Sequence, residues 1–200
     1  MSDHYYSKTQ QTESNPKYWN YTLRNQSFRF KTDNGVFSKN EVDFGSRLLI
    51  ETFEKPSLDG NILDVGCGYG PIGLSVAKQY PDRTVHMVDV NERALSLAKE
   101  NAELNGIKNV CIYESDQLED VKDHSFAAIL TNPPIRAGKM VVHGIFEQSA
   151  NHLLSGGELW VVIQKKQGAP SAIDKLSELF GDVETVEKKK GYFIIKAKKD

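Results

Sequence analysis

Cysteine is scarce in this sequence of 200 residues, and histidine shows no clustering. The two cysteines, Cys67 and Cys111, form no Cys-x-x-Cys pair, and the five histidines lack the spacing of a metal site. Neither a disulfide framework nor a metal site is therefore expected. Cys111 falls in an apolar segment and is predicted to be a small core residue.

Long apolar runs are missing as well. No stretch approaches the roughly 20 apolar residues that a membrane-spanning helix needs. Residues 1–6 do not open a secretory signal, which would combine a basic segment with an apolar one. The sequence therefore favours a cytoplasmic protein without membrane association. Its 39% of hydrophobic residues suffice for one globular domain with a sizeable core.

An excess of positive charge is also absent, because 25 Lys and Arg face 27 Asp and Glu, for a net charge of −2. Proteins that bind nucleic acid broadly usually carry a basic surface, since neutralising phosphates supplies much of the affinity. Broad binding is thus disfavoured. A local patch stays open, with residues 188–199 and 136–139 as candidates.

The sequence does contain a regular alternation of strand-like and helix-like segments. Strands are predicted at residues 61–65, 84–90, 109–114, 126–131, 158–163, 183–187 and 192–196. Helices are predicted at 40–53 (capped by Asn40), 71–79, 91–105 (capped by Asn91), 142–154 and 169–180. This alternation predicts an α/β fold with a doubly wound, mostly parallel seven-stranded sheet that ends in a C-terminal antiparallel strand.

An aromatic-rich stretch precedes this alternation. Residues 18–23 and 27–31 alternate in polarity around a short polar turn, which predicts a β-hairpin. Its aromatic side chains are expected to pack on the core rather than stack on bases. One domain is predicted over residues 1–200, with a loose tail (1–16), the hairpin and first helix (17–55) and the catalytic core (56–200).

Glycine gathers in Asp64-Val-Gly-Cys-Gly-Tyr-Gly70, between a predicted strand and a predicted helix. Because glycine lacks Cβ and accepts positive φ, the backbone at Gly66, Gly68 and Gly70 can approach a ligand closely. The helix N-terminus adds a partial positive charge. Such a turn holds a nucleoside cofactor in α/β domains. The spacing to Gly73 also matches the dinucleotide fingerprint, so a nicotinamide-binding oxidoreductase is one alternative.

Acidic residues stand near the ends of the first three core strands. Asp64 precedes the glycine turn, where a carboxylate would repel a pyrophosphate but suits an ammonium or sulfonium ligand. Asp89 ends the next strand, the usual place for an acid that binds ribose hydroxyls in either cofactor. Asp116 follows the third strand and can accept a hydrogen bond from an adenine amino group. Cys67 and Val90 complete this candidate cofactor site.

A second motif, Thr131-Asn-Pro-Pro-Ile135, ends the fourth core strand. The side-chain oxygen of Asn132 and the carbonyl of Pro133 can each accept an N–H bond from a planar amino group. Such bonds favour a pyramidal nitrogen and stabilise the positive charge that develops on it. Pro133 and Pro134 restrict the backbone and hold these acceptors in place. Together the two motifs favour methyl transfer from S-adenosylmethionine to an amino nitrogen.

The motifs resemble those of a known family. Residues 64–70 are similar to the first signature of class I S-adenosylmethionine-dependent methyltransferases, and residues 131–135 to the Asn-Pro-Pro signature of members that methylate amino groups. Residues 35–38 and 43–47 resemble the small methyltransferase group that includes bacterial small-subunit ribosomal RNA guanine-N2 methyltransferases. The resemblance covers roughly residues 30–200. It implies a Rossmann-like methyltransferase fold, S-adenosylmethionine as cofactor and guanine of ribosomal RNA as acceptor.

Site roles follow from the resemblance and from the residues around the second motif. Asn132, Pro133 and Pro134 are the predicted catalytic residues, and Asn132 is also expected to contact the cofactor. The predicted substrate-binding residues are Phe37, whose segment folds over the site in the family, Ile135 as an apolar wall, and Arg136 and Lys139. These two can reach a phosphate or another polar group of the substrate, and ordinary surface charge is the alternative for them. Many Asn-Pro-Pro enzymes carry an aromatic residue at the position of Ile135. A glutamine amide of a protein is the alternative acceptor.

Overall fold

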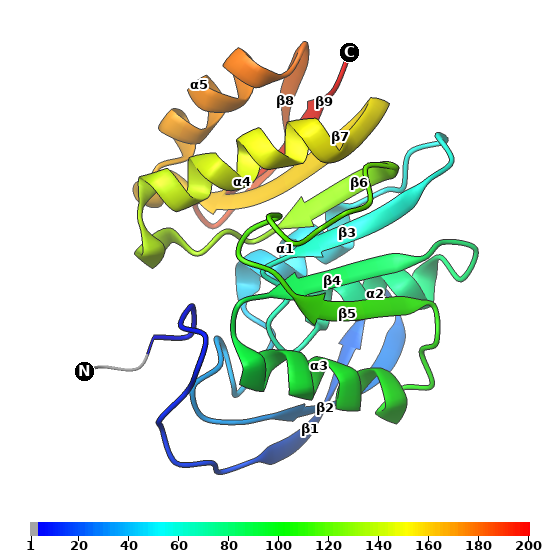
Figure 1. The fold of residues 1–200 in the computed structure, drawn as a ribbon, viewed down its shortest axis with the longest axis vertical. Coiled ribbons are helices and arrows are strands. Elements are labelled where there is room, and N and C mark those ends of the chain that lie inside the picture. The colour runs from blue at the N-terminus through cyan, green and yellow to red at the C-terminus, as the bar shows by residue number, and fades with distance from the viewer. Residues whose placement is uncertain (1–3) are drawn as a thin grey trace.

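The computed structural model describes residues 4–200. Its main sheet has seven strands in the order β5-β4-β3-β6-β7-β9-β8, as Figure 1 shows. The strands are β3 (Asn61–Val65), β4 (Val85–Asp89), β5 (Val110–Glu114), β6 (Phe126–Thr131), β7 (Leu153–Gln164), β8 (Asp182–Lys189) and β9 (Tyr192–Lys198). β9 pairs antiparallel with β7 and β8, and the other neighbouring strands of this sheet pair in parallel. The predicted α/β fold with a mostly parallel sheet is confirmed.

Helices cover both faces of this sheet, each over its own hydrophobic cluster. On one face lie α1 (Phe44–Thr52), α2 (Pro71–Gln79) and α3 (Glu92–Leu104). On the other lie α4 (Lys139–His152) and α5 (Ala169–Leu179). The chain runs outward from β3 to β5, then returns to add β6 on the other side of β3. Ligands of open α/β sheets bind at such a reversal, beyond the carboxyl ends of the strands.

The N-terminal hairpin forms as predicted from β1 (Lys17–Leu23) and β2 (Gln26–Thr32). Its turn residues Arg24 and Asn25 have φ of 51° and 60°. Phe28 and Phe30 are buried in the core, which agrees with the packing role expected of the hairpin's aromatic residues. The side chain of Asn101 on α3 holds β2, accepting from Lys31 N at 2.7 Å and donating to Lys31 O at 3.0 Å.

The first helix starts later than predicted. Asp43, not Asn40, is its N-cap, and its carboxylate accepts a hydrogen bond from Ser46 N at 3.1 Å. The residues before Asp43 form turns instead, with Ser38 at a φ of 52°. Asn40 has the right residue type for a cap, but the helical hydrogen bonds begin only after Asp43.

The boundary between α4 and β7 is also different. The helix begins at Lys139 and ends at His152, and Leu153 already belongs to β7, whereas we predicted a helix at 142–154 and a strand from 158. The sheet register explains this: Leu153 pairs with Phe126, and the ladder resumes only with Glu158 opposite Ala128. The glycine pair at 156–157 lies within this irregular part of the strand, with Gly156 at a φ of 78°.

Two further expectations are wrong. The predicted loose tail has no helix or strand over residues 4–16, and residues 1–3 of it lie outside the described residues. The described part is not loose, because Lys8 O accepts from Glu92 N at 3.0 Å and the Lys8 ammonium lies 2.6 Å from the Glu114 carboxylate. Cys111 is exposed rather than in the core. Its strand, β5, is the edge of the sheet, so the side chains on one of its faces are poorly covered.

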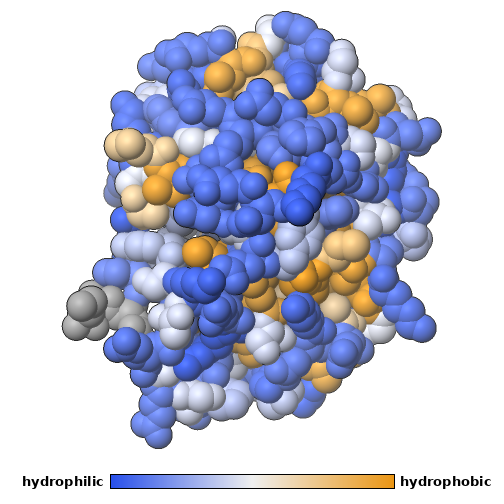
Figure 2. All heavy atoms as spheres, viewed as in Figure 1, coloured by the Kyte–Doolittle hydropathy of each residue, from blue (hydrophilic) through white to orange (hydrophobic). Residues whose placement is uncertain are grey.

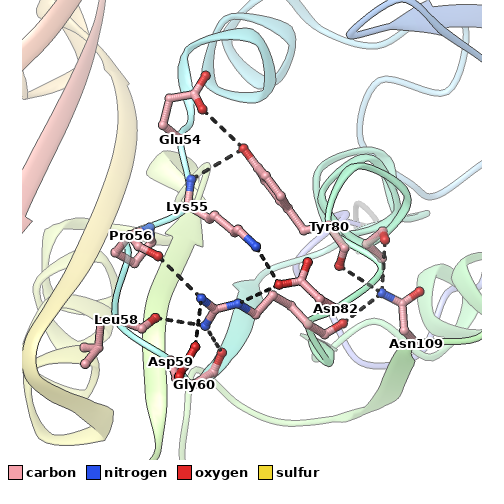
Figure 3. A network of polar contacts seen from close by, with 11 residues as sticks. Glu54, Lys55, Pro56, Leu58, Asp59, Gly60, Tyr80, Asp82 and Asn109 are labelled. Atoms are coloured by element: carbon pink, nitrogen blue, oxygen red, sulfur yellow. Dashed lines mark hydrogen bonds and ion pairs between the residues drawn. The ribbon is translucent and has the colours of Figure 1, made fainter.

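A buried arginine stabilises the end of the sheet at which the parallel strands begin. Arg83 donates to the carbonyls of Leu58 and Gly60 at 2.9 and 2.8 Å and lies 3.5 Å from the Asp82 carboxylate (Figure 3). These contacts tie the loop before β3 to the loop before β4.

Within residues 4–200 no helix is long and apolar enough to cross a membrane, and the face in Figure 2 is mostly hydrophilic.

Candidate active site

The two sequence motifs meet at the reversal point of the sheet. Val65 and Thr131 are paired at the ends of β3 and β6, and the Thr131 hydroxyl donates to Val65 O at 3.0 Å. Gly66 and Asn132 follow directly on these two residues. Both motifs therefore open onto one cavity of about 730 Å³ at the carboxyl edge of the strands. This volume lies within the usual range for a cofactor or small-molecule site.

Most of the predicted site residues line this cavity. They are Phe37, Gly66, Cys67, Gly68, Asp89, Val90, Asp116, Asn132, Pro133, Pro134, Ile135 and Arg136. Three do not: Asp64, Gly70 and Lys139. Lys139 lies instead on a smaller neighbouring cavity of about 140 Å³.

The glycines of the turn serve two different purposes. A Cβ built on Gly66 or Gly68 would meet no atom within 4 Å, and both residues have positive φ, of 74° and 57°. Their backbone is thus bare toward the cavity, as a closely held nucleoside cofactor requires. Gly70, in contrast, packs inward, because a Cβ there would lie 2.8 Å from the Leu74 side chain. Gly70 therefore shapes the junction with α2 and does not line the cavity.

Asp64 supports this turn from beneath. It is buried, and its Oδ2 accepts from Gly73 N in the first turn of α2 at 2.8 Å. Burial raises the pKa of this carboxyl to about 7, against the opposing effect of the Gly73 bond. The expectation that Asp64 faces the ligand does not hold, since its strand places the side chain under the glycine turn.

Asp89 does face the cavity, and two backbone amides orient it. Its Oδ2 accepts from Gly68 N at 2.8 Å, and its Oδ1 accepts from Asn91 N at 2.9 Å. Burial raises the pKa of the Asp89 carboxyl, while these backbone bonds act in the opposite direction. The carboxylate thereby links the glycine turn to the end of β4 and holds one orientation on the cavity wall.

Asn132 is held by the start of α1. Its Nδ2 donates to Ser46 Oγ at 3.0 Å and to Asp43 Oδ2 at 3.3 Å. A carboxylate only accepts hydrogen bonds, so Asp43 fixes which end of the amide faces it. None of the described residues donates to the remaining Oδ1. Ser46 and Asp43, called the clamp below, therefore hold the Asn132 amide by its nitrogen and leave its oxygen available beside the Gly66 turn.

Sequence reasoning missed a wall made by the N-terminal tail. Tyr5 and Tyr6 line the cavity, and the Tyr5 ring lies 5.2 Å from that of Phe37. Asn91 joins these segments, because its Nδ2 donates to Tyr5 O at 2.8 Å and to Gly35 O at 2.9 Å. The same side chain caps α3. The polar, aperiodic tail offered no signal for this role beyond its two adjacent tyrosines.

Sequence reasoning also missed residues at the far end of the cavity. They are Gln164 at the end of β7, Gln167 in the short 3-10 helix that follows, and Tyr192 at the start of β9. The strand order therefore divides the cavity into two halves. The ends of β3, β4 and β5 form one half, and the ends of β6 and β7 with the start of β9 form the other, with Asn132 where they join.

Comparison with known proteins identifies the family. A family model described as the methyltransferase small domain matches residues 27–196. The chain belongs to this family. Protein YbxB of Bacillus subtilis, described as uncharacterized, is 66% identical over the full length of both chains. Ribosomal RNA small subunit methyltransferase C of Vibrio parahaemolyticus is 35% identical over 92% of this chain and 53% of its own length.

A solved structure has the same fold. The T. thermophilus 16S rRNA N2 G1207 methyltransferase (RsmC), in complex with AdoMet and guanosine, matches with a TM-score of 0.83 and 24% identity over 92% of this chain and 51% of that chain. The chain thus spans about half the length of these two methyltransferase relatives. As a methyltransferase small domain, it is an S-adenosylmethionine-dependent methyltransferase with the predicted Rossmann-like fold.

Proposed function

We propose that this methyltransferase acts on an exocyclic amino group of RNA, with N2 of guanine in small-subunit ribosomal RNA as the acceptor. The clamped Asn132 carries the proposal, because it presents an amide oxygen where the two halves of the cavity meet. The 35% identity to an enzyme of small-subunit ribosomal RNA supports the substrate class. The guanosine in the related T. thermophilus complex supports the base. Such an enzyme works in the cytoplasm.

The half of the cavity formed by β3, β4 and β5 is the proposed cofactor site. Gly66, Cys67 and Gly68 offer bare backbone, and the oriented Asp89 carboxylate suits the two ribose hydroxyls. Asp116 and Val90 lie at the neighbouring strand ends, where an adenine ring would be held. When bound, S-adenosylmethionine supplies an electrophilic methyl group, so the chain's residues need only position the acceptor.

The other half of the cavity is the proposed acceptor site. Asn132 Oδ1 and the Pro133 carbonyl accept the two N–H groups of the amine, which favours a pyramidal nitrogen and stabilises its developing positive charge. Phe37 and Ile135 offer apolar surface to a flat base, and Arg136 reaches its phosphate. Lys139 lies off the main cavity and can act only on a more distant phosphate.

The test combines cofactor binding with methyl transfer. RNA and protein from cells that lack this chain are incubated with the purified chain and tritiated S-adenosylmethionine, and calorimetry measures cofactor affinity. We expect label in RNA. Asn132→Ala should lower the transfer rate by about 10²–10³-fold, as loss of a transition-state hydrogen-bond partner does. Its cofactor affinity should stay close to that of the wild type.

Each other outcome contradicts a stated part of the proposal. Label confined to protein would favour a glutamine amide as acceptor, and absence of label from both fractions would refute amino methylation. Equal losses of binding and transfer in Asn132→Ala would contradict its catalytic role. A nicotinamide oxidoreductase is disfavoured because the methyltransferase small domain model matches most of the chain. We also propose that residues 1–200 form one methyltransferase domain.

A further inference from the structure

Two lysine-rich segments, far apart in sequence, meet beside the acceptor half of the cavity. Lys165 and Lys166 lie in the short 3-10 helix η2 (Lys165–Gln167) that follows β7. Lys188, Lys189 and Lys190 lie at the turn between β8 and β9. Lys165 N donates to Gly191 O at 2.9 Å, which joins the two segments. These five residues are called the lysine patch below.

The patch borders the acceptor site through a short series of contacts. Gln164 and Tyr192 form a residue pair between β7 and β9, and both line the cavity next to the patch. The Tyr192 ring lies 5.4 Å from the ring of Phe44, and the Lys190 ammonium lies 5.0 Å above that same ring. Phe44 begins α1, the helix whose N-terminus holds Asn132.

The charge of the patch is not neutralised within the protein. All five lysines are exposed, and among residues 4–200 none of their ammonium groups lies within 4.0 Å of a carboxylate. Other lysines do form such pairs: Lys175 lies 2.8 Å from Glu147. The whole chain has a net charge of −2, so the positive charge at this edge of the cavity is a local feature of the surface.

We propose that the lysine patch binds the phosphate backbone of the acceptor RNA beside the target nucleotide. The inference rests on the proposed function, in which the acceptor is RNA. A base inserted in the acceptor half leaves its flanking phosphates at the rim of the cavity, where these lysines lie. Lysine ammonium groups bind phosphates as flexible point charges and without reading sequence, so the patch positions the RNA and the cavity selects the base.

The test compares two variants with equal loss of charge. The patch variant is Lys188→Gln/Lys189→Gln/Lys190→Gln. The control is Lys99→Gln/Lys108→Gln/Lys122→Gln, which changes three exposed lysines on α3 and in the loops before β5 and β6. Those control positions also lack a carboxylate within 4.0 Å among the described residues.

Fluorescence anisotropy would measure binding of a single-stranded RNA of about 20 nucleotides between 50 and 300 mM salt. Each phosphate contact to single-stranded RNA contributes about −0.7 to the slope of log K against log salt concentration, which is about fivefold in affinity at 0.1 M salt. The patch variant should therefore lose about 2 from the magnitude of the slope and about 100-fold in affinity. In transfer assays it should raise KM for RNA, with unchanged kcat and cofactor affinity. The control variant should match the wild type.

The outcomes separate this inference from the function on which it rests. If the wild type methylates RNA while the patch variant keeps its affinity and salt slope, the patch is only solvated surface and the proposed function stands. Equal losses in the patch and control variants would show a nonspecific effect of net charge and overturn the inference. A wild type that labels only protein overturns the proposed function and, with it, an RNA-binding role for the patch.

Discussion

Loss of the Ser46 hydroxyl should slow methyl transfer and leave cofactor binding unchanged. Ser46 is buried, and its Oγ receives the shorter of the two hydrogen bonds from Asn132 Nδ2, 3.0 Å against 3.3 Å to Asp43. Ser46→Ala removes that bond and leaves only the longer one. A neutral hydrogen bond contributes about 0.5–1.5 kcal/mol net, and 1.4 kcal/mol corresponds to tenfold in rate. We therefore expect kcat to fall by about 2- to 12-fold.

The assay is single-turnover transfer of tritium to RNA at saturating cofactor, with calorimetry of cofactor binding alongside. The matched control is Ser149→Ala on α4, because Ser149 is also fully buried but its Oγ has no hydrogen-bond partner among the described residues. The control should keep the wild-type rate. Wild-type turnover in Ser46→Ala, or equal slowing in both variants, would refute the role that we assign to the clamp.

Three other predictions concern the support of the site. The pKa of the Asp64 carboxyl is about 7 in the folded chain, against an ordinary value of 3.8. Between pH 4 and pH 7 the folded chain therefore holds a proton on Asp64 that the unfolded chain does not. The free energy of unfolding should fall by up to about 4 kcal/mol as the pH rises through this range. Urea unfolding across that range should show Asp64→Asn gaining on the wild type, and parallel curves would contradict this. Asn101→Ala removes both hydrogen bonds to the Lys31 backbone and should lower the free energy of unfolding by about 2–3 kcal/mol in the same assay. An unchanged urea midpoint would show that the hairpin packs on α3 without the Asn101 side chain. Asn91→Asp keeps a capping oxygen but loses the donor to Tyr5 O and to Gly35 O, so calorimetry should show cofactor affinity about tenfold weaker. Unchanged affinity would show that the junction of the tail with the Gly35 segment does not support the cofactor site.

Much of the fold could be predicted because glycine and proline mark the ends of its elements. The strands at 61–65 and 126–131 and the helix at 71–79 have the bounds predicted for them. The errors occur where tertiary pairing decides. Leu153 is apolar and continues the helical pattern, and only its pairing with Phe126 across the sheet places it in a strand.

The site could be predicted where its residues directly follow strand ends. Asp64 and Asp89 appear equivalent in sequence, since each lies at or next to the end of an apolar strand. Their position along the sheet separates them: Asp64 is paired with Met87 and lies beneath the turn, whereas Asp89 lies two residues beyond Met87, at the end of β4 on the cavity wall. Ser46 and Tyr5 could not be found this way, because distant segments bring them to the cavity and no local pattern records that contact.

The most direct test of the account is the identity of the methylated product. RNA from cells that lack this chain would be labelled with tritiated S-adenosylmethionine by the purified protein, digested to nucleosides and separated by chromatography with mass detection. The account predicts that the label co-migrates with N2-methylguanosine. Label on a ring nitrogen, a carbon or a ribose oxygen would contradict it, since none of these presents the two N–H groups that Asn132 and Pro133 are placed to accept.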